Sequence, residues 1–209
     1  MNNNIKTMTM NAARAVLNQG KTALLVCDIQ EGFAKAMKGF DLFVQNSSRL
    51  VSALKILNVP MIVSEQYPKA LGKTVPEIDI SGAKVFAKTQ FNMCIPELRK
   101  ELSTICSGKK PESIILIGLE AHICIENSAI DLRMNGYEVH LVANCCYSRT
   151  QEDRLLALQR MRDIGCQITT SENVLYKLMK DSNHKEFKNV LSFVKTPIAY
   201  TGLVPVAKI

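Results

Sequence analysis

Cys124 is the residue whose position most clearly suggests chemistry. It follows the short apolar run of residues 113–117, at the point where a helical pattern begins that ends at Asn135 and Gly136. An apolar run of this kind predicts a strand buried on both faces. A thiol at the start of the next helix would face unpaired backbone N–H groups, which lower its pKa and can hold an oxyanion. The alternative is that Cys124 is a small core residue, as free cysteines usually are.

Two more reactive side chains follow predicted strands. Asp28 ends the apolar run of residues 22–28, and Lys88 ends the short run of residues 84–88. Parallel sheets bind ligands outside the carboxyl ends of their strands, so we expect these side chains to lie near Cys124. A carboxylate can accept the thiol proton, and an ammonium stabilises the thiolate and a developing oxyanion. Singly, Asp28 could be a cap and Lys88 a surface charge; together with Cys124 they favour a catalytic set.

Alternating strand and helix patterns would position these residues. Strands are expected at 22–28, 61–65, 84–88, 113–118, 137–143 and 167–169. Helices are expected at 41–57, 96–106, 124–134, 151–164, from residue 171 onward, and at 184–194. Thr150 or Ser148 would cap the helix 151–164, with Asp153 completing a capping box. Because the helices are long enough for crossover connections, the pattern predicts a three-layer α/β fold: a mostly parallel, Rossmann-like sheet with helices on both faces.

The chain is expected to form one domain of about residues 21–196, between an N-terminal extension (1–20) and a C-terminal tail (197–209). Within the domain, residues 66–83 are expected to form a long loop, and loops of this length usually have a function. A cytoplasmic location is expected. The basic, acid-poor start is also compatible with a mitochondrial presequence, and the ending Ala207-Lys208-Ile209 resembles a peroxisomal Ser-Lys-Leu-type signal.

Composition excludes several classes of protein. Hydrophobic residues make up 47% and charged residues 22%, and no apolar run approaches the length of a membrane span. The net charge of +7 is spread along the chain without an arginine-rich tract, so no nucleic-acid partner is expected. The seven cysteines are odd in number and lack zinc spacing, and the three histidines are scattered. We therefore expect reduced thiols and no metal site.

Three motifs, in the same order along the chain, resemble those of the isochorismatase-like cysteine hydrolases. They are Asp28-Ile29-Gln30, Phe86-Ala87-Lys88-Thr89 with Phe91 following, and Gly118-Leu119-Glu120-Ala121-His122-Ile123-Cys124. The resemblance covers about residues 20 to 195. The segments 64–69 and 148–154 look like the isochorismatase domain-containing protein 1/2 branch of that superfamily.

This resemblance implies an Asp28–Lys88–Cys124 triad and a particular reaction. Asp28 would be the general base for the Cys124 thiol, and Lys88 would hold the thiolate and the developing charge. The backbone N–H groups of Glu120 and Cys124 would form the oxyanion hole, with a cis peptide bond between Leu119 and Glu120. The implied reaction is attack on a small amide-like carbonyl, release of the amine, and hydrolysis of a thioester.

Two departures from the family narrow the reaction. The metal-binding nicotinamidases carry an Asp-x-His motif after the second strand, where this chain has Ser64-Glu65-Gln66. True isochorismatases typically lack the nucleophilic cysteine, which this chain keeps as Cys124. The expectation is a metal-independent, cofactor-free hydrolase of the amidase type. The resemblance also implies a homo-oligomer.

The lining of the substrate pocket is predicted from loops that leave the relevant strand ends. Phe33, Gln66, Tyr67 and Phe91 are the candidates, with loop packing as the alternative. For several residues near these motifs, a structural role is the simpler interpretation. Cys27, beside Asp28, should point to the opposite face of its strand and pack in the core. His122 is as readily an interface or capping residue, and Arg149 and Arg154 could pair with acids across a subunit contact.

Two other functions stay open at this point. A non-catalytic interaction protein on the same fold would bind its partner without Cys124. A thiol redox or aldehyde-binding protein would use Cys124 without hydrolysis. The fold by itself is compatible with each of these functions.

Overall fold

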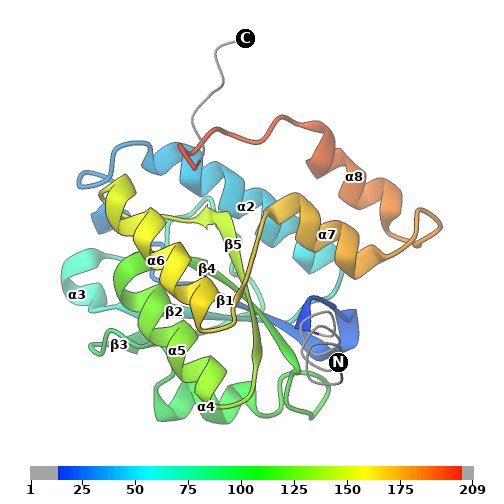
Figure 1. Ribbon diagram of the computed structural model, residues 1–209, viewed down its shortest axis with the longest axis horizontal. Helices are drawn as coiled ribbons and strands as arrows, with labels where there is room; N and C mark the ends of the chain where they lie inside the picture. Colours follow the sequence, from blue (N-terminus) through cyan, green and yellow to red (C-terminus); the bar gives the residue numbers. More distant parts are fainter. Residues whose placement is uncertain (1–13, 204–209) are drawn as a thin grey trace, which may run out of the picture.

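The computed structural model describes residues 14–203, and its centre is a six-stranded sheet in which every neighbouring pair is parallel (Figure 1). The strands lie in the order β3-β2-β1-β4-β5-β6. Their bounds are β1 Thr22–Cys27, β2 Met61–Gln66, β3 Lys84–Lys88, β4 Ser113–Gly118, β5 Glu138–Cys146 and β6 Gln167–Thr169. The order reverses between β1 and β4, which is where open α/β sheets bind ligands. The predicted three-layer α/β fold is confirmed, and its described strands are all parallel rather than mostly so.

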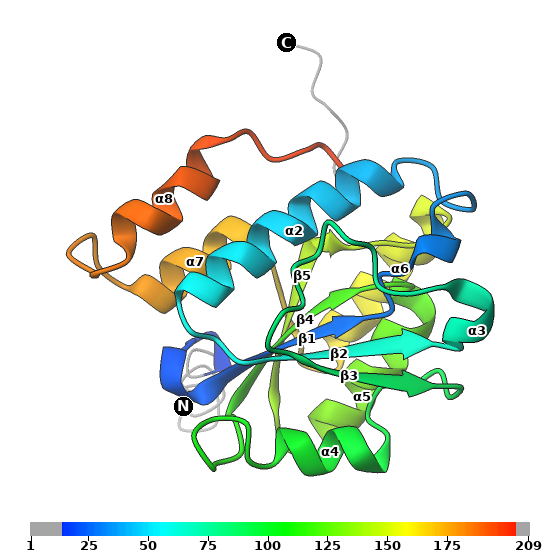
Figure 2. The same ribbon diagram turned by 180° about the vertical axis from the view of Figure 1, so that it is seen from behind.

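Helices cover both faces of the sheet, as Figures 1 and 2 show from opposite sides. The helices are α2 Phe40–Ile56, α3 Pro68–Leu71, α4 Pro96–Leu102, α5 Glu126–Met134, α6 Gln151–Asp163, α7 Ser171–Met179 and α8 Phe187–Lys195. Helices α2, α7 and α8 contribute to one hydrophobic cluster, and α4, α5 and α6 to the other. The crossover helices that link parallel strands therefore bury the sheet from both sides.

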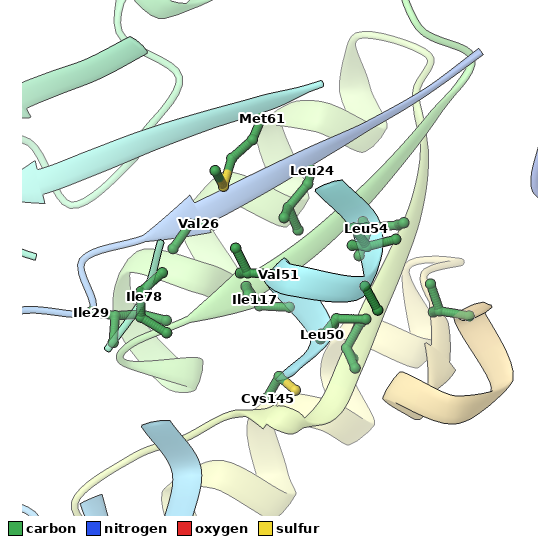
Figure 3. Packing of buried hydrophobic residues seen from close by; sticks show 14 of the residues in the cluster. Leu24, Val26, Ile29, Leu50, Val51, Leu54, Met61, Ile78, Ile117 and Cys145 are labelled. Atoms are coloured by element: carbon green, nitrogen blue, oxygen red, sulfur yellow. The ribbon is translucent and has the colours of Figure 1, made fainter. Parts of the chain in front are cut away.

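Strand β1 contributes side chains to both hydrophobic clusters, because successive side chains of a strand point to opposite faces of the sheet. Leu24 and Val26 pack with α2 on one side, as Figure 3 shows, whereas Leu25 and Cys27 pack on the side of α4 and α5. All six residues of β1 are buried. The continuous apolar run that predicted a strand covered on both faces is thus explained by its central place in the sheet.

Several boundaries differ from the predicted ones. The helix expected over 96–106 ends at Leu102, since Ser107 and Gly108 take positive φ angles and the Cys106 N–H bonds to the carbonyl of Lys109. Strand β5 continues to Cys146, so the vicinal cysteines belong to the sheet. Thr150 caps α6 as expected, since its hydroxyl accepts a hydrogen bond from the backbone N–H of Asp153. The Asp153 carboxylate accepts from the Thr150 hydroxyl, which differs from the second hydrogen bond of the expected capping box.

The ends of the described chain lie against the domain. Leu17, within the expected N-terminal extension, is 1% exposed in the core. In the expected C-terminal tail, Ala199 exchanges hydrogen bonds with the side chain of Asn46, and Thr201 accepts from Arg154. The tripeptide 207–209 lies outside the described residues. None of the helices described here is both long and apolar enough to cross a membrane.

Candidate active site

Asp28 lies at the carboxyl end of β1 with both carboxylate oxygens engaged. The chain leaves the strand there, because Asp28 takes a left-handed φ of 55°. Its side chain is fully buried. Oδ1 accepts a hydrogen bond of 2.7 Å from the Ser64 hydroxyl, and Oδ2 accepts one of 2.6 Å from the Lys88 ammonium. A buried carboxylate needs such partners, since leaving a charge unpaired away from water is costly.

Lys88 is the central cation of the site. Its Nζ lies 2.6 Å from the Asp28 carboxylate, 2.7 Å from Oε1 of Gln66 and 3.1 Å from the carbonyl oxygen of Gln90. The same nitrogen lies 3.7 Å from the sulfur of Cys124. The three residues that the sequence placed at strand ends therefore meet around one ammonium group.

The charged form of Lys88 is favoured by this environment. Burial by itself lowers the pKa of Lys88, but attraction to Cys27, Asp28 and Cys124 outweighs burial, so that its pKa lies above the ordinary 10.5. The raised pKa favours the charged form of Lys88 at neutral pH. A negative charge within a few ångströms is the usual reason why the pKa of a lysine rises.

Cys124 lies in a π-helical turn, Ala121–Ile125, that leads directly into α5. Such turns are rare and are frequent at functional sites. The carbonyl of Cys124 accepts a hydrogen bond of 2.6 Å from the Ser128 hydroxyl, and that hydroxyl accepts one of 2.9 Å from the backbone N–H of Met93. Ser128 thus ties the turn that carries Cys124 to the segment after β3.

All seven cysteines are buried, Cys124 included. Burial raises the pKa of Cys94, Cys146 and Cys166 to about 12, and also raises the pKa of Cys27, Cys106 and Cys145. All seven cysteines are free. These six residues are poor nucleophiles at neutral pH, because the thiolate is the reactive form.

Cys27 lies closer to the site than strand alternation predicted. It is fully buried, as expected, but it belongs to the same hydrophobic cluster as Cys124, with which its side chain interacts. The left-handed turn at Asp28 explains the difference. The alternation ends at Cys27, so Cys27 and Asp28 can both approach the site from one strand end.

The peptide before the π-helical turn has the geometry that the family resemblance implied. The bond between Leu119 and Glu120 is cis. Within residues 14–203, the Glu120 backbone N–H donates no hydrogen bond to another backbone or side-chain group. The Glu120 carboxylate is buried and pairs with Arg149 at 3.0 Å, while His122 lies 3.0 Å from the Ser148 hydroxyl. These contacts hold the peptide next to Cys124.

A cleft of about 540 Å³ includes Lys88 in its lining, whereas Asp28 and Cys124 are buried and do not belong to that lining. Its lining comes from the ends of β2 and β3 and the start of α4: Tyr67, Pro68, Lys69, Ala87, Lys88, Thr89, Gln90, Ile95, Pro96 and Glu97. The volume is in the range of small-molecule sites. A larger hollow, of about 930 Å³, lies elsewhere and includes no triad residue.

The four predicted substrate-binding residues are placed differently from one another. Tyr67 lines the cleft and is half exposed. Gln66 contacts Lys88 from behind the cleft. Phe91 is 61% exposed on the loop after β3 and does not belong to the cleft lining. Phe33 packs against the hydrophobic cluster on the α2 side of the sheet, away from the cleft.

One interpretation of the sequence placed Arg154 at a subunit contact, but in the structure it lies inside its own chain. The residue is fully buried, its guanidinium donates to the carbonyls of Ala143 and Thr201, and it lies over the ring of Tyr147. Arg149 pairs with Glu120 of its own chain. The positive charge of the two arginines in the sequence did not indicate which groups each of them contacts in the structure.

Three polar residues of the site were missed in the sequence. Ser64 holds Asp28, Ser128 holds the Cys124 turn, and Gln30 bonds to both the backbone N–H and the carbonyl of Gln66. Ser64 could have been noticed as a hydroxyl that follows the apolar residues 61–63 at a strand end. Among the described residues, no group of three or more His, Cys, Asp or Glu side chains has the arrangement of a metal site.

Comparisons with known proteins agree with this geometry. The sequence profile of the isochorismatase domain matches residues 22–173. The chain is 43% identical to isochorismatase domain-containing protein 2 of Xenopus laevis over 90% of each chain. It is also 43% identical to isochorismatase domain-containing protein 1 of Danio rerio, covering 90% of this chain but only 66% of that protein. The structure of MAR1 ribonuclease from Caenorhabditis elegans is 40% identical, with a TM-score of 0.87, over 93% of this chain and 100% of that one.

Proposed function

This chain belongs to the isochorismatase family, and we propose that it is a metal-independent cysteine hydrolase that cleaves a small amide-like C–N bond through a Cys124 thioester. One observation carries the proposal. The buried ammonium of Lys88 contacts both the Asp28 carboxylate, at 2.6 Å, and the Cys124 sulfur, at 3.7 Å. A thiol beside a fixed cation and a carboxylate has the partners that an activated nucleophile requires.

The first step forms the thioester. The Cys124 thiol gives its proton to Asp28, and the sulfur attacks the carbonyl carbon of the substrate. The tetrahedral intermediate collapses, the C–N bond breaks, and the leaving nitrogen takes the proton from Asp28. The second step adds water to the thioester with Asp28 as base, which releases the carboxylic acid and restores the Cys124 thiol. Lys88 stays charged throughout and stabilises the negative charge on sulfur and oxygen.

The oxyanion hole is proposed at the backbone N–H groups of Glu120 and Cys124. Among residues 14–203 the Glu120 N–H has no protein acceptor, which supports this assignment, because such a donor is ready to bond to a developing oxyanion. The position of Cys124 before α5 adds the positive end of that helix.

We propose that the substrate is a small molecule, because the volume of the cleft is in the range of small-molecule sites. Its lining mixes apolar residues with hydroxyl and amide groups, together with one further cation, Lys69, and one acid, Glu97. We propose that Tyr67 packs against the substrate at the mouth of the cleft.

The proposed reaction needs no cofactor. Metal independence is tested with a chelator: turnover should be the same with and without EDTA.

The first experiment is limited labelling with iodoacetamide at neutral pH, with each cysteine measured by peptide mass. We expect Cys124 to react well ahead of the other six cysteines, and to slow in Asp28→Asn and Lys88→Met. Cys106→Ala is the matched control, since Cys106 lies near the carbonyl of Thr22 at the opposite end of β1. This variant should leave the labelling of Cys124 unchanged.

A screen of small amides and imides then tests turnover. The proposal expects the native protein and Cys106→Ala to turn over a substrate that Cys124→Ala does not. A reactive Cys124 that turns over no amide but is oxidised by peroxide would support the thiol redox function instead. If Cys124 reacts no faster than the other six cysteines, the proposal is wrong and a non-catalytic interaction role becomes the leading function.

RNA cleavage is a second candidate, favoured by the name of the Caenorhabditis elegans relative, MAR1 ribonuclease. It is tested by incubating single-stranded and hairpin RNA with the native protein and Cys124→Ala, each purified free of ribonuclease. Cleavage that Cys124→Ala lacks, with binding that falls steeply as salt rises, would support this function. Equal traces of cleavage in both preparations would count against it.

We also propose that the protein is a homo-oligomer. Exposed apolar residues gather on the adjacent helices α5 and α6, among them Met134, 82% exposed, and Leu156, 55% exposed. Large exposed apolar side chains of this kind are typical of interaction surfaces. Light scattering on the eluting protein measures the mass directly, and a monomer at micromolar concentration would contradict the proposal.

A further inference from the structure

The Lys88 ammonium has more neighbours than it has protons. An ammonium donates three hydrogen bonds, and three oxygen atoms lie within 3.1 Å of Nζ, from Asp28, Gln66 and Gln90. The Cys124 sulfur is the fourth neighbour, at 3.7 Å. The position of Nζ between the carboxylate and the sulfur therefore depends on the oxygen atoms that hold it from the other sides. Of these, the side-chain oxygen of Gln66 makes the short contact, at 2.7 Å.

The amide of Gln66 can bind Lys88 in one orientation only. Its Nε2 donates to the carbonyl of Thr89 at 2.9 Å, and its Oε1 accepts from Lys88. Turning the amide over would place a donor against the ammonium and an acceptor against a carbonyl oxygen, so both hydrogen bonds would be lost. The parallel pairing of β2 with β3 sets Gln66 beside Lys88 in register.

The backbone of Gln66 is held as firmly as its side chain. Gln30, which is fully buried after β1, accepts from the Gln66 N–H at 2.7 Å and donates to the Gln66 carbonyl at 3.0 Å. Its Nε2 also donates to the carbonyl of Gly72 at 2.8 Å. One buried amide thus fixes the ends of β1 and β2 and the loop before β3 relative to one another.

We infer that Gln66, fixed by Gln30, is the positioning residue that aims the Lys88 ammonium between Asp28 and Cys124, rather than a residue that binds substrate. The inference rests on the proposed function, since it concerns how the same site activates its thiol. Gln66 is suited to this role because it is neutral. It holds the cation without adding a second negative charge beside the Cys124 thiolate, which a carboxylate at this position would do.

Two measurements on the full chain test the role without a known substrate. The first is the rate of Cys124 alkylation by iodoacetamide as a function of pH. The second is the hydrogen exchange of the Lys88 ammonium, followed by ¹H–¹⁵N NMR, which reports the hydrogen bonds of Nζ even if Cys124 is not a nucleophile. The variant is Gln66→Met, which keeps the length of the side chain and removes the acceptor.

A control variant separates this role from a general effect of the replacement. Gln45→Met makes the same replacement at an exposed position of α2. This control should match the native protein in alkylation and in exchange. Thermal unfolding of each variant checks that the fold is retained, and Gln30→Met, a second route to the same effect, covers the case in which Gln66→Met does not fold.

We expect Gln66→Met to raise the pH midpoint of Cys124 alkylation by about one unit, to slow alkylation about tenfold at neutral pH, and to speed exchange at Lys88 at least about tenfold. A Gln66→Met protein that matches the native one in both measurements overturns the inference and restores Gln66 as a substrate-binding candidate. If exchange at Lys88 depends on Gln66 but Cys124 is no more reactive than the other cysteines, the positioning role is supported and the proposed function fails.

Discussion

The ammonium of Lys88 and the carboxylate of Asp28 form an ion pair of 2.6 Å from which solvent is fully excluded, both side chains being 0% exposed. A buried pair of this kind contributes little net stability compared with apolar residues, but losing one partner leaves the other charge uncompensated. The pair therefore couples the stability of the fold to the integrity of the site.

Lys88→Met should destabilise the protein by about 3 to 5 kcal/mol, because Asp28 then keeps a buried charge with Ser64 as its remaining partner. The double variant Asp28→Asn/Lys88→Met should lose less than the sum of the two single losses. Urea unfolding measures all three. Lys84→Met is the control: Lys84 lies on the same strand in an exposed pair with Glu101, which should cost at most about 1 kcal/mol. Strictly additive losses would show that the two charges are not coupled.

Gly118→Ala should prevent folding. Gly118 has a φ of 132°, and a Cβ there would lie 1.9 Å from the carbonyl oxygen of Cys27 on the neighbouring strand. That carbonyl also accepts the N–H of Leu119, so it cannot move away freely. We expect a loss above about 4 kcal/mol, seen as absence of folded protein by circular dichroism.

The control is Gly20→Ala, where a Cβ would meet nothing within 4 Å. It should fold and melt like the native protein. A folded Gly118→Ala protein with unchanged melting would mean that β1 and β4 are less tightly joined than described.

His140 should make stability depend on pH. Its side chain is buried in β5, and within the described residues neither ring nitrogen is hydrogen-bonded; burial, with a smaller effect of Lys177, lowers its pKa from 6.5 to about 4. Between these values the unfolded chain binds a proton that the folded chain does not. Stability is therefore fully present above pH 6.5 and falls as the pH drops toward 4, by about 3 kcal/mol in all.

Urea unfolding of the native protein and His140→Phe at several pH values between 4 and 7 isolates this effect. The difference between the two curves should grow in favour of the variant as the pH falls. Leu141→Ile, which alters packing on the same strand without a titrating group, should follow the native curve. A constant difference between native protein and His140→Phe would contradict the assignment.

Arg154 should hold the C-terminal segment to the domain. Its guanidinium donates to the carbonyls of Ala143 and Thr201, no acidic side chain between residues 14 and 203 pairs with it, and burial lowers its pKa. Arg154→Met should cost about 2 kcal/mol and expose the segment around Thr201 to proteolysis. Arg162→Met, at an exposed position of α6, should change neither property. Unchanged proteolysis in Arg154→Met would mean that other contacts hold this segment.

Ser64 and Gln66 show why part of the site could not be predicted. Whether a polar residue at a strand end faces a charge or solvent depends on which strand lies beside it and in which register. That information comes from the pairing of β2 with β1 and β3, not from local sequence. Phe33 illustrates the same limit, since a loop that leaves the correct strand end turned toward the opposite face of the sheet.

The sequence by itself determined the strands, their parallel arrangement and the three strand ends that carry Asp28, Lys88 and Cys124. It could do so because apolar runs, helix spacing and caps are local properties of the chain. Only the tertiary structure decided that these residues meet around one ammonium, that Gln66 and Gln30 hold it, and that Cys27 lies beside Cys124. Those relationships arise from strand order, from register and from the left-handed turn at Asp28, which bring together residues far apart in the chain.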